Sequence, residues 1–436
     1  MLKAIINFYN PQKELKLKEY NSREYINKRW GVFAAAILGY SIYYVCRLSF
    51  SIVKKPIIDA HIFSESEVGI IGSALFFSYA IGKMVNGFIA DRVNIRKFFA
   101  TGLLASAVIC SALGFTQNFV LFTFLWGLLG WFQSMGAAPC AVVISRWYNN
   151  AQRGTYYSLW SASHSLGKAI TYWIIAFAVA SFGWQWGFWS ASIIGFVGVI
   201  IILLLMYDSP QSRGFAPIIQ TVQQKTVGSF QKEVFKNKAV WILAFASALM
   251  YISRYALESW GVFYLETEKQ YSNLQASSIL SISAITGIFG TIVSGFVSDK
   301  FFKGSRNVPA LIAGVLNIIS LIIFLFFPKN MFLDSLSMAI SGFAMGILIT
   351  FVGGLMAVDI VPKQATGAAL GLIGISSYIG AGLQDIISGY FIQKGKTTSL
   401  IGKVNYDFSQ VAYLWLGAAI ISVILVLFVW NSKTNE

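Results

Sequence analysis

Charged residues are scarce in this sequence of 436 residues, since aspartate, glutamate, lysine and arginine together make up only 12% of it. A typical water-soluble domain contains about 25% of them. In their place the chain carries 56% hydrophobic residues, and its mean hydropathy is +0.65. Apolar stretches long enough to cross a bilayer recur along nearly the whole length. The composition therefore excludes a soluble globular protein and predicts a helical protein that crosses a membrane many times.

Cysteine is scarce as well. The three cysteines, Cys46, Cys110 and Cys140, all fall within apolar stretches, and their spacing fits neither a metal site nor a disulfide framework. A nucleophile, a histidine and an acid arranged for catalysis are also missing. We therefore expect no metal, no cofactor and no enzymatic activity. We also expect no secretory signal peptide, because residues 1–29 are polar and basic and the first apolar stretch is long enough to span.

Acidic residues are outnumbered, with 18 aspartates and glutamates against 33 lysines and arginines, so the formal net charge is +15. Such a charge can indicate a nucleic-acid partner. Here, however, most of the basic residues fall in one set of alternating loops, and basic residues of membrane proteins collect on the cytoplasmic side. We therefore expect the lipid bilayer rather than nucleic acid as the partner, with both termini in the cytoplasm and the chain in the cell (inner) membrane.

Twelve spans are predicted, six on each side of a long polar break from Tyr207 to Lys238 that contains Pro210 and Pro217. The spans cover residues 30–53, 67–90, 97–115, 119–141, 154–181, 186–206, 240–264, 274–297, 308–327, 331–356, 367–391 and 411–430. The predicted domains are a cytoplasmic tail (1–29), a first six-helix bundle (30–206), a cytoplasmic linker (207–239), a second six-helix bundle (240–430) and a second cytoplasmic tail (431–436). The fold class is therefore all-α, a polytopic membrane protein with two pseudo-symmetric six-helix bundles.

A short motif occurs once in each half, in the loops after the second and the eighth predicted span. Residues 87–99 read GFIADRVNIRKFF, and residues 295–306 read GFVSDKFFKGSR. In both, a glycine and a phenylalanine precede an aspartate, and basic residues follow it. This repetition indicates duplication of the half. We expect a structural role for the two aspartates, Asp91 and Asp299, as hydrogen-bond acceptors at a helix end.

The paired motif resembles the signature of the major facilitator superfamily. Longer stretches are similar to the organophosphate:phosphate antiporters of that superfamily, which include bacterial glycerol-3-phosphate and hexose-6-phosphate transporters. These stretches are YYVCRLSF (43–50), YAIGKMVNGFIADR (79–92), GWFQSMGAAPC (130–140), RGTYYSLWSASHSLG (153–167), YISRYALESWGVFYL (251–265) and SGFVSDKFFKGSR (294–306). The resemblance covers most of the chain except its N-terminal tail and central loop. It implies a carrier that exchanges inorganic phosphate for an organic phosphate.

Two arginines lie inside predicted spans, Arg47 in the first span and Arg254 in the seventh. An arginine at mid-bilayer costs about 2.5–3.5 kcal/mol and persists only beside a partner or a watery cavity. Each guanidinium can offer two parallel N–H donors to phosphate oxygens. We expect both to bind the substrate's phosphate group, as the resemblance also implies. The alternative for Arg254 is a structural ion pair with Glu258, which lies four residues later on the same helix face.

Lys83 and His164 are further candidates, and the resemblance implies a place in the phosphate site for both. The alternatives are that the Lys83 side chain reaches water and that His164 forms a hydrogen bond to a backbone carbonyl. Tyr43 and Tyr44 flank Arg47, and tyrosine hydroxyls can donate to phosphate. Because these two neighbours point in different directions, we expect at most one of them to reach the ligand directly.

Lys168 departs from the pattern of the glycerol-phosphate branch, which has a glycine-rich run at this position. It lies four residues after His164, on the same helix face. Asp385 is the intramembrane acid that would balance its charge. We predict that Lys168 and Asp385 either pair across the two halves or contact sugar hydroxyls. The alternative for Asp385 is a position at the outer mouth, in water.

The expected function is the exchange of a sugar phosphate for inorganic phosphate by alternating access. The additional polar groups favour hexose 6-phosphate, such as glucose 6-phosphate, over glycerol 3-phosphate. The remaining alternatives are a glycerol-3-phosphate antiporter, a sugar-phosphate sensor built like a transporter, and a proton-coupled symporter that uses Asp385 or Glu258. We expect a monomer to be sufficient, because a fold of this kind needs no partner to complete its pathway.

Overall fold

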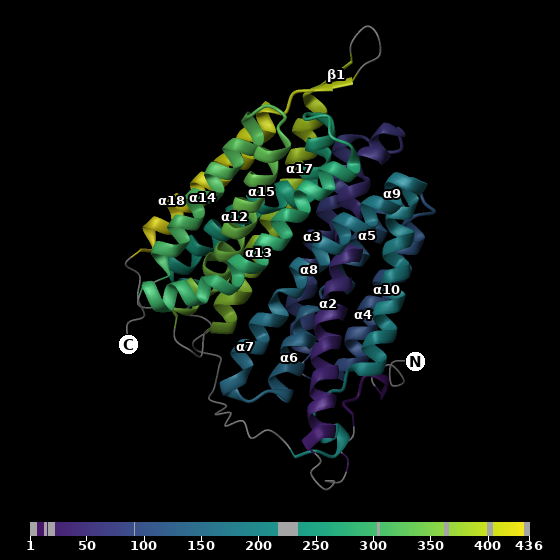
Figure 1. Ribbon diagram of the computed structural model, residues 1–436, viewed down its shortest axis with the longest axis vertical. Helices are drawn as coiled ribbons and strands as arrows, with labels where there is room; N and C mark the ends of the chain where they lie inside the picture. The colour runs from purple at the N-terminus through teal and green to yellow at the C-terminus, as the bar shows by residue number, and fades with distance from the viewer. Residues whose placement is uncertain are drawn as a thin grey trace.

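The computed structural model describes residues 7–12, 15, 22–90, 92–216, 234–302, 306–361, 366–398 and 404–430, and it is built almost entirely of helices (Figure 1). In this part of the chain, twelve helical segments are long and apolar enough to cross a membrane. The predicted all-α fold with twelve spans is therefore confirmed. Asp91 lies outside the described residues, as does the side chain of Asp299, so the role of the paired aspartates stays a prediction.

The first six spans form one bundle, which is purple to blue in Figure 1. Two of its spans are broken into several helices. Its elements are α2 (Ser22–Asp59), α3 (Glu65–Ala90), α4 (Ile95–Leu113), α5 (Phe119–Gln133), α6 (Ala137–Trp147), α7 (Asn150–Ser161), α8 (Ser163–Ile170), η1 (Thr171–Ile175), α9 (Ala176–Phe182) and α10 (Gln185–Leu205). The short 3-10 helix η2 (Gln211–Arg213) follows. We refer to these elements as the first bundle.

The other six spans form the second bundle, which is green to yellow in Figure 1. Its elements are α12 (Lys238–Thr267), α13 (Asn273–Phe301), α14 (Asn307–Phe326), α15 (Met331–Thr350), η3 (Phe351–Leu355), α16 (Met356–Val358), α17 (Thr366–Lys394), β1 (Lys396–Thr398), β2 (Val404–Tyr406) and α18 (Ser409–Phe428). The π-helical turns η1 and η3 interrupt two spans, and such turns are frequent at functional sites.

Local sequence explains where several helices begin. Asn94, Asn118 and Asn237 each precede a helix, and their side chains accept a hydrogen bond from a backbone N–H of the first turn. Ser272 forms a reciprocal capping box with Gln275 at the start of α13. These caps satisfy backbone donors that the helix itself leaves unpaired, so the chain can turn sharply between spans.

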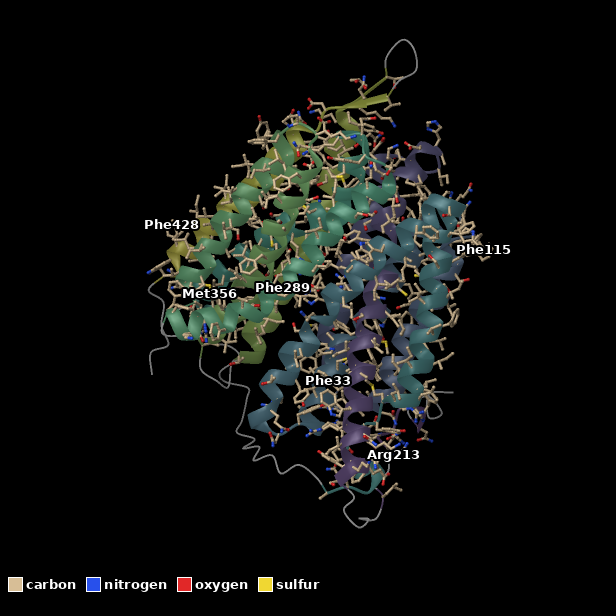
Figure 2. All side chains as sticks on the ribbon, in the orientation of Figure 1. Phe33, Phe115, Arg213, Phe289, Met356 and Phe428 are labelled. Atoms are coloured by element: carbon tan, nitrogen blue, oxygen red, sulfur yellow. The ribbon has the colours of Figure 1, made fainter. Side chains whose placement is uncertain are left out.

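Large apolar side chains cover the outside of both bundles, where a bilayer would lie. Phe115 and Phe428 project from opposite sides of the molecule and are 77% and 72% exposed (Figure 2). Phe33, by contrast, is buried in the first bundle. This distribution is that of a multi-pass membrane protein, whose surface is as apolar as its interior.

Helix α2 extends beyond the predicted span at both ends. The sequence predicted a span over 30–53, because Lys54 and Lys55 end the apolar stretch, but the helix continues through Pro56 to Asp59. Lys54 is nevertheless buried completely. Its burial is possible because the second bundle covers this part of α2 and supplies polar partners, as described below.

The two bundles meet along α2, α3 and α8 of the first and α12, α13 and α17 of the second. Helix α2 begins at the lower end of Figure 1, and β1 stands at the upper end, which we call the hairpin end. Near the hairpin end α3 and α17 cross in backbone contact. A Cβ atom on Gly69 would lie 2.5 Å from the carbonyl oxygen of Asp385, and one on Gly389 would lie 2.6 Å from that of Glu65. Larger residues at these two positions would therefore force the bundles apart.

A short hairpin that the sequence did not predict joins the bundles at this end. Strands β1 and β2 are antiparallel, and Lys396 is opposite Tyr406. From this cross-strand pair, Lys396 Nζ and the Tyr406 hydroxyl donate to Glu65 Oε1 over 2.7 and 2.6 Å. Glu65 belongs to α3 of the first bundle and is buried. The hairpin end is therefore held closed by a carboxylate of one bundle and two donors of the other.

Candidate functional site

Arg47 is buried where α2 faces the second bundle. Its guanidinium carbon lies 4.4 Å from the ring centroid of Tyr79 and 5.3 Å from that of Tyr378. Its Nη2 donates to the Tyr255 hydroxyl over 3.0 Å, whereas its buried Nε has no hydrogen-bond partner. None of the carboxylates in the described ranges forms an ion pair with it. Aromatic faces, rather than an acid, therefore stabilise this cation, and a donor is left free for a ligand.

Arg254 faces the first bundle from α12. Its Nε donates to Glu258 Oε1 over 2.9 Å, and its buried Nη2 has no partner. The same oxygen of Glu258 accepts a hydrogen bond from Lys168 Nζ, on α8 of the first bundle, over 2.8 Å. The alternative of an Arg254–Glu258 ion pair is therefore present in the structure. It does not neutralise the region, however, because one carboxylate serves two cations.

The charges of this cluster do not cancel. Arg47, Arg254 and Lys168 are three buried cations, and Glu258 is a single carboxylate. The cluster therefore has an excess of two positive charges. Buried charge without a counter-ion is costly, and its interaction with an anion is stronger here than in water. The arrangement favours a doubly charged anion.

Tyr255 lies between the two arginines. Its ring centroid is 5.8 Å from the guanidinium carbon of Arg47 and 5.1 Å from that of Arg254. The Arg47–Tyr255 hydrogen bond therefore links the bundles at the point where an anion would bind both guanidinium groups. Sequence analysis named Tyr43 and Tyr44 instead, because they are neighbours of Arg47 in the chain.

Two small cavities adjoin the cluster. One, of about 20 Å³, is lined in part by Arg47, Tyr255, Glu258 and Asp385. The other, of about 30 Å³, is lined in part by His164, Lys168, Arg254 and Glu258. Each has room for only one or a few water molecules. A phosphate ester therefore requires the bundles to move apart before it reaches the arginines.

Three of the other predicted residues lie around this cluster. The Tyr44 ring is 5.6 Å from the Arg47 guanidinium carbon and 5.7 Å from the His164 ring. His164 Nδ1 is hydrogen-bonded to the backbone carbonyl of Ser161, which is the alternative considered for it. Lys83 is exposed, and its Nζ lies 5.4 Å from the Tyr378 ring centroid. The structure thus places Lys83 at the edge of the aromatic group around Arg47, on the side away from the hairpin.

Two predictions are corrected by the structure. Tyr43 points into its own bundle, where its hydroxyl donates to the carbonyl oxygen of Phe99 over 2.7 Å and its ring stacks on that phenylalanine. It does not line the site. The predicted Lys168–Asp385 pair is also wrong, because Lys168 reaches Glu258 instead. Asp385 is buried nearer the hairpin end, not in water at an outer mouth, and its partner is Lys54.

Comparisons with known proteins place this chain among membrane transporters. Residues 36–384 match the model of the Major Facilitator Superfamily. A "Probable hexose phosphate transport protein" of Chlamydia pneumoniae is 30% identical over 98% of both chains. The "Glycerol-3-phosphate transporter" of Bacillus subtilis is 28% identical, again over 98% of both chains. The "Membrane sensor protein UhpC" of Escherichia coli is 29% identical over 79% of this chain and 82% of its own.

Solved structures with a similar fold are transporters as well. The crystal structure of a bacterial homolog of the human lysosomal transporter Spinster, in an inward-facing and unoccupied conformation, has a TM-score of 0.70. It covers 93% of this chain and 95% of its own, at 17% identity. At this identity the likeness concerns the fold alone.

Proposed function

This chain belongs to the Major Facilitator Superfamily, and we propose that it exchanges a sugar phosphate for inorganic phosphate. The observation that carries the proposal is the buried excess of two positive charges at the interface between the bundles. A phosphate monoester carries up to two negative charges near neutral pH and offers several acceptor oxygens. The superfamily consists of transporters, which confirms the expectation of a carrier rather than an enzyme.

Hexose 6-phosphate is the proposed organic substrate. The chlamydial relative is named a probable hexose phosphate transport protein, and the match with it extends over nearly all of both chains. The glycerol-3-phosphate transporter of Bacillus subtilis makes the three-carbon ester the second candidate. Both substrates present the same phosphate group to the arginines and differ only in the hydroxyl-bearing remainder.

We place both termini in the cytoplasm of a cell whose inner membrane holds the protein. The alternating distribution of basic residues supports this orientation. The hairpin end then faces outward. The described hydrogen bonds and ion pairs between the bundles lie in the middle of the spans and toward the hairpin end, as in Lys168–Glu258, Lys54–Asp385 and Lys396–Glu65. The conformation is therefore closed outward, and a substrate would arrive from the cytoplasm.

The exchange cycle follows from the unpaired donors. A phosphate group arriving from the cytoplasm accepts hydrogen bonds from Arg47 Nε and Arg254 Nη2, which are free in this structure. It also attracts Lys168 away from Glu258 Oε1. The anion then supplies the negative charge that holds the two bundles together around the site, so the carrier reorients when it is loaded. When the site is empty, the excess positive charge opposes closure, and net efflux without exchange is slow.

Purified protein in liposomes tests this proposal. Labelled phosphate should enter quickly when the liposomes contain phosphate or hexose 6-phosphate and slowly when they contain neither. Arg47→Gln and Arg254→Gln should each abolish uptake. The matched control is Lys329→Gln, which also removes one positive charge but lies in an exposed loop, where its Nζ donates to the carbonyl oxygen of Gln270 and lies 4.4 Å from the Tyr271 ring centroid. Phosphate efflux that is equally fast with and without external phosphate would refute obligatory exchange.

A sensor is the second candidate function, because one relative is named a membrane sensor protein. A sensor with this site would bind hexose 6-phosphate but would not catalyse its exchange. Binding without measurable flux in the same liposomes therefore distinguishes it from a transporter. In either case we propose that a monomer is sufficient, since both arginines of the site come from one chain.

A further inference from the structure

Lys54 is a buried cation outside the arginine cluster, and its described hydrogen-bond and ion-pair partners belong to the opposite bundle, whereas the Phe50 ring on its own helix lies 5.5 Å from Nζ. It lies on α2 and is 0% exposed. Its Nζ donates to Ser259 Oγ over 2.7 Å and lies 3.4 Å from Asp385 Oδ1. It also stands 3.8 Å from the ring centroid of Trp260. Ser259 and Trp260 are on α12, and Asp385 is on α17.

Separation of the bundles would affect the two charges of this pair differently. Asp385 Oδ1 accepts hydrogen bonds from Ser259 Oγ and from Trp260 Nε1, each over 2.7 Å, and both donors belong to its own bundle. It keeps these partners when the hairpin end opens. Lys54, by contrast, leaves Asp385, Ser259 and Trp260 together. Because an unpaired buried cation is costly, the opened state has a lysine in need of an anion or of water.

The position of Lys54 relates it to the arginine site. It follows Arg47 by seven residues on α2, which is two helical turns and a rise of about 10.5 Å. Seven residues also return the side chain to nearly the same helix face, so Lys54 and Arg47 both face the second bundle. Lys83 lies on the other side of Arg47 and is exposed in this structure. The first bundle thus carries cations at three levels along the interface.

We propose that Lys54 is an outer binding site for the phosphate group, used when the carrier is open outward. A phosphate group from outside binds Lys54 first and then moves about two turns inward to Arg47. When the outer side closes, the carboxylate of Asp385 replaces the phosphate group on Lys54, and the buried pair is neutral. The proposal rests on the exchange function proposed above.

In this proposal Asp385 does not contact the substrate. Its carboxylate takes the place of the phosphate group on Lys54 when the outer side is closed. Its Oδ2 is buried without a hydrogen-bond partner, so the closed pair is not fully satisfied and is not strongly stabilised against opening. Competition between Asp385 and phosphate for Lys54 also releases the anion from this site. As the outer side closes, the carboxylate displaces any anion left at Lys54, and that anion is either carried inward to Arg47 or lost to the outside.

The decisive comparison is between Asp385→Asn and the double variant Lys54→Met/Asp385→Asn. Neither protein has the Lys54–Asp385 ion pair, so any effect of losing that clamp is common to both. They differ in the cation at position 54 and in its contacts to Ser259 and Trp260. The probe is labelled inorganic phosphate, with the apparent affinity measured separately from the outer and inner faces of liposomes in which the protein has one orientation. We expect the double variant to bind external phosphate about tenfold more weakly than Asp385→Asn, with a much smaller difference at the inner face.

Equal external affinities of the two variants would overturn the proposal and leave Lys54–Asp385 as a clamp only. A tenfold difference of the same size at both faces would overturn it as well, because it would place Lys54 in the central site. If the unaltered protein shows no phosphate exchange, the proposed function fails instead, and the two failures are thereby distinguished.

A chemical rescue tests the proposal even if Asp385→Asn alone does not fold, because the cation at position 54 is then added after folding. Lys54→Cys/Asp385→Asn, in a background where Cys46, Cys110 and Cys140 are replaced by alanine, can be modified from outside after purification. An aminoethyl thiosulfonate restores a positive charge at position 54, and a methyl thiosulfonate adds a neutral group. We expect external phosphate affinity to recover with the first reagent only. Equal affinity after both reagents would contradict an anion site at this position.

Discussion

Glu258→Gln is the sharpest test of the charge arrangement. Glu258 Oε1 accepts hydrogen bonds from both Arg254 Nε and Lys168 Nζ, at 2.9 and 2.8 Å. The substitution keeps the shape of the side chain but removes the only carboxylate of the cluster, so the excess rises from two positive charges to three. Removing one partner of a buried ion pair costs about 3–5 kcal/mol. Coulomb's law gives an attraction of about 6 kcal/mol to one cation at these distances and an effective dielectric constant of 20. The two estimates agree in size.

A bound phosphate group would replace the missing carboxylate. We therefore expect the Glu258→Gln protein to melt several degrees below the unaltered protein in phosphate-free buffer. Added phosphate should raise its melting temperature more than that of the unaltered protein, because a ligand that binds the folded state more tightly stabilises that state more at the same concentration. Exchange should slow, since release of the tightly held anion leaves Lys168 and Arg254 without an acid.

The matched control is Glu266→Gln. Glu266 lies two turns further along α12, is similarly buried and takes part in none of the ion pairs described for this chain. Its substitution should leave the phosphate-dependent shift of the melting temperature unchanged. The measurement is intrinsic tryptophan fluorescence of detergent-solubilised protein over a phosphate series. If Glu258→Gln gains no more stability from phosphate than the unaltered protein does, the cluster is not a phosphate site and the charge argument is wrong.

Three other predictions test separate parts of the structure. Arg47→Lys keeps the charge but loses the forked donors, so exchange in liposomes should fall at least about tenfold, or about 1.4 kcal/mol; activity close to normal would exclude bidentate binding. A cleavable bifunctional thiol reagent that joins Glu65→Cys to Lys396→Cys should lock the hairpin end and stop exchange until the cross-link is reduced. A cross-link within the hairpin, between Lys396→Cys and Tyr406→Cys, should not. Tyr43→Phe removes one buried hydrogen bond and should lower stability by about 1 kcal/mol without changing phosphate affinity in a binding assay.

The parts that the sequence predicted well depend on local properties. The number of spans follows from runs of apolar residues, and the burial of Arg47 and Arg254 between the bundles follows from the cost of a charge within such a run. Both signals can be read in a window of about 20 residues. The Arg254–Glu258 contact was likewise visible as a spacing of four on one helix face.

The partners across the interface could not be predicted in this way. Lys168 and Glu258 are 90 residues apart, and Lys54 and Asp385 are 331 residues apart. Charge balance alone suggested Lys168 as the partner of Asp385. In the structure Lys168 pairs with Glu258 and Lys54 pairs with Asp385, so each lysine pairs with the acid at its own level in the membrane. Lys54 was missed for a related reason. Hydropathy treats a lysine as the end of a span, whereas here the second bundle covers α2 past that point.

The ion pairs between the bundles also bear on how the interface could alternate between two states. Lys54–Asp385, Lys168–Glu258 and Lys396–Glu65 each join a lysine of one bundle to an acid of the other. Such pairs must break whenever the bundles separate at that level, and every broken pair leaves charges to be satisfied by water or by substrate. At the outer levels the pairs are balanced one to one, so closure there needs no ligand. At the level of Arg47, Arg254 and Lys168, the described residues supply a single carboxylate, Glu258, so an anion from solution would favour closure around the site. The exchange that we propose for this chain rests on this difference between the levels.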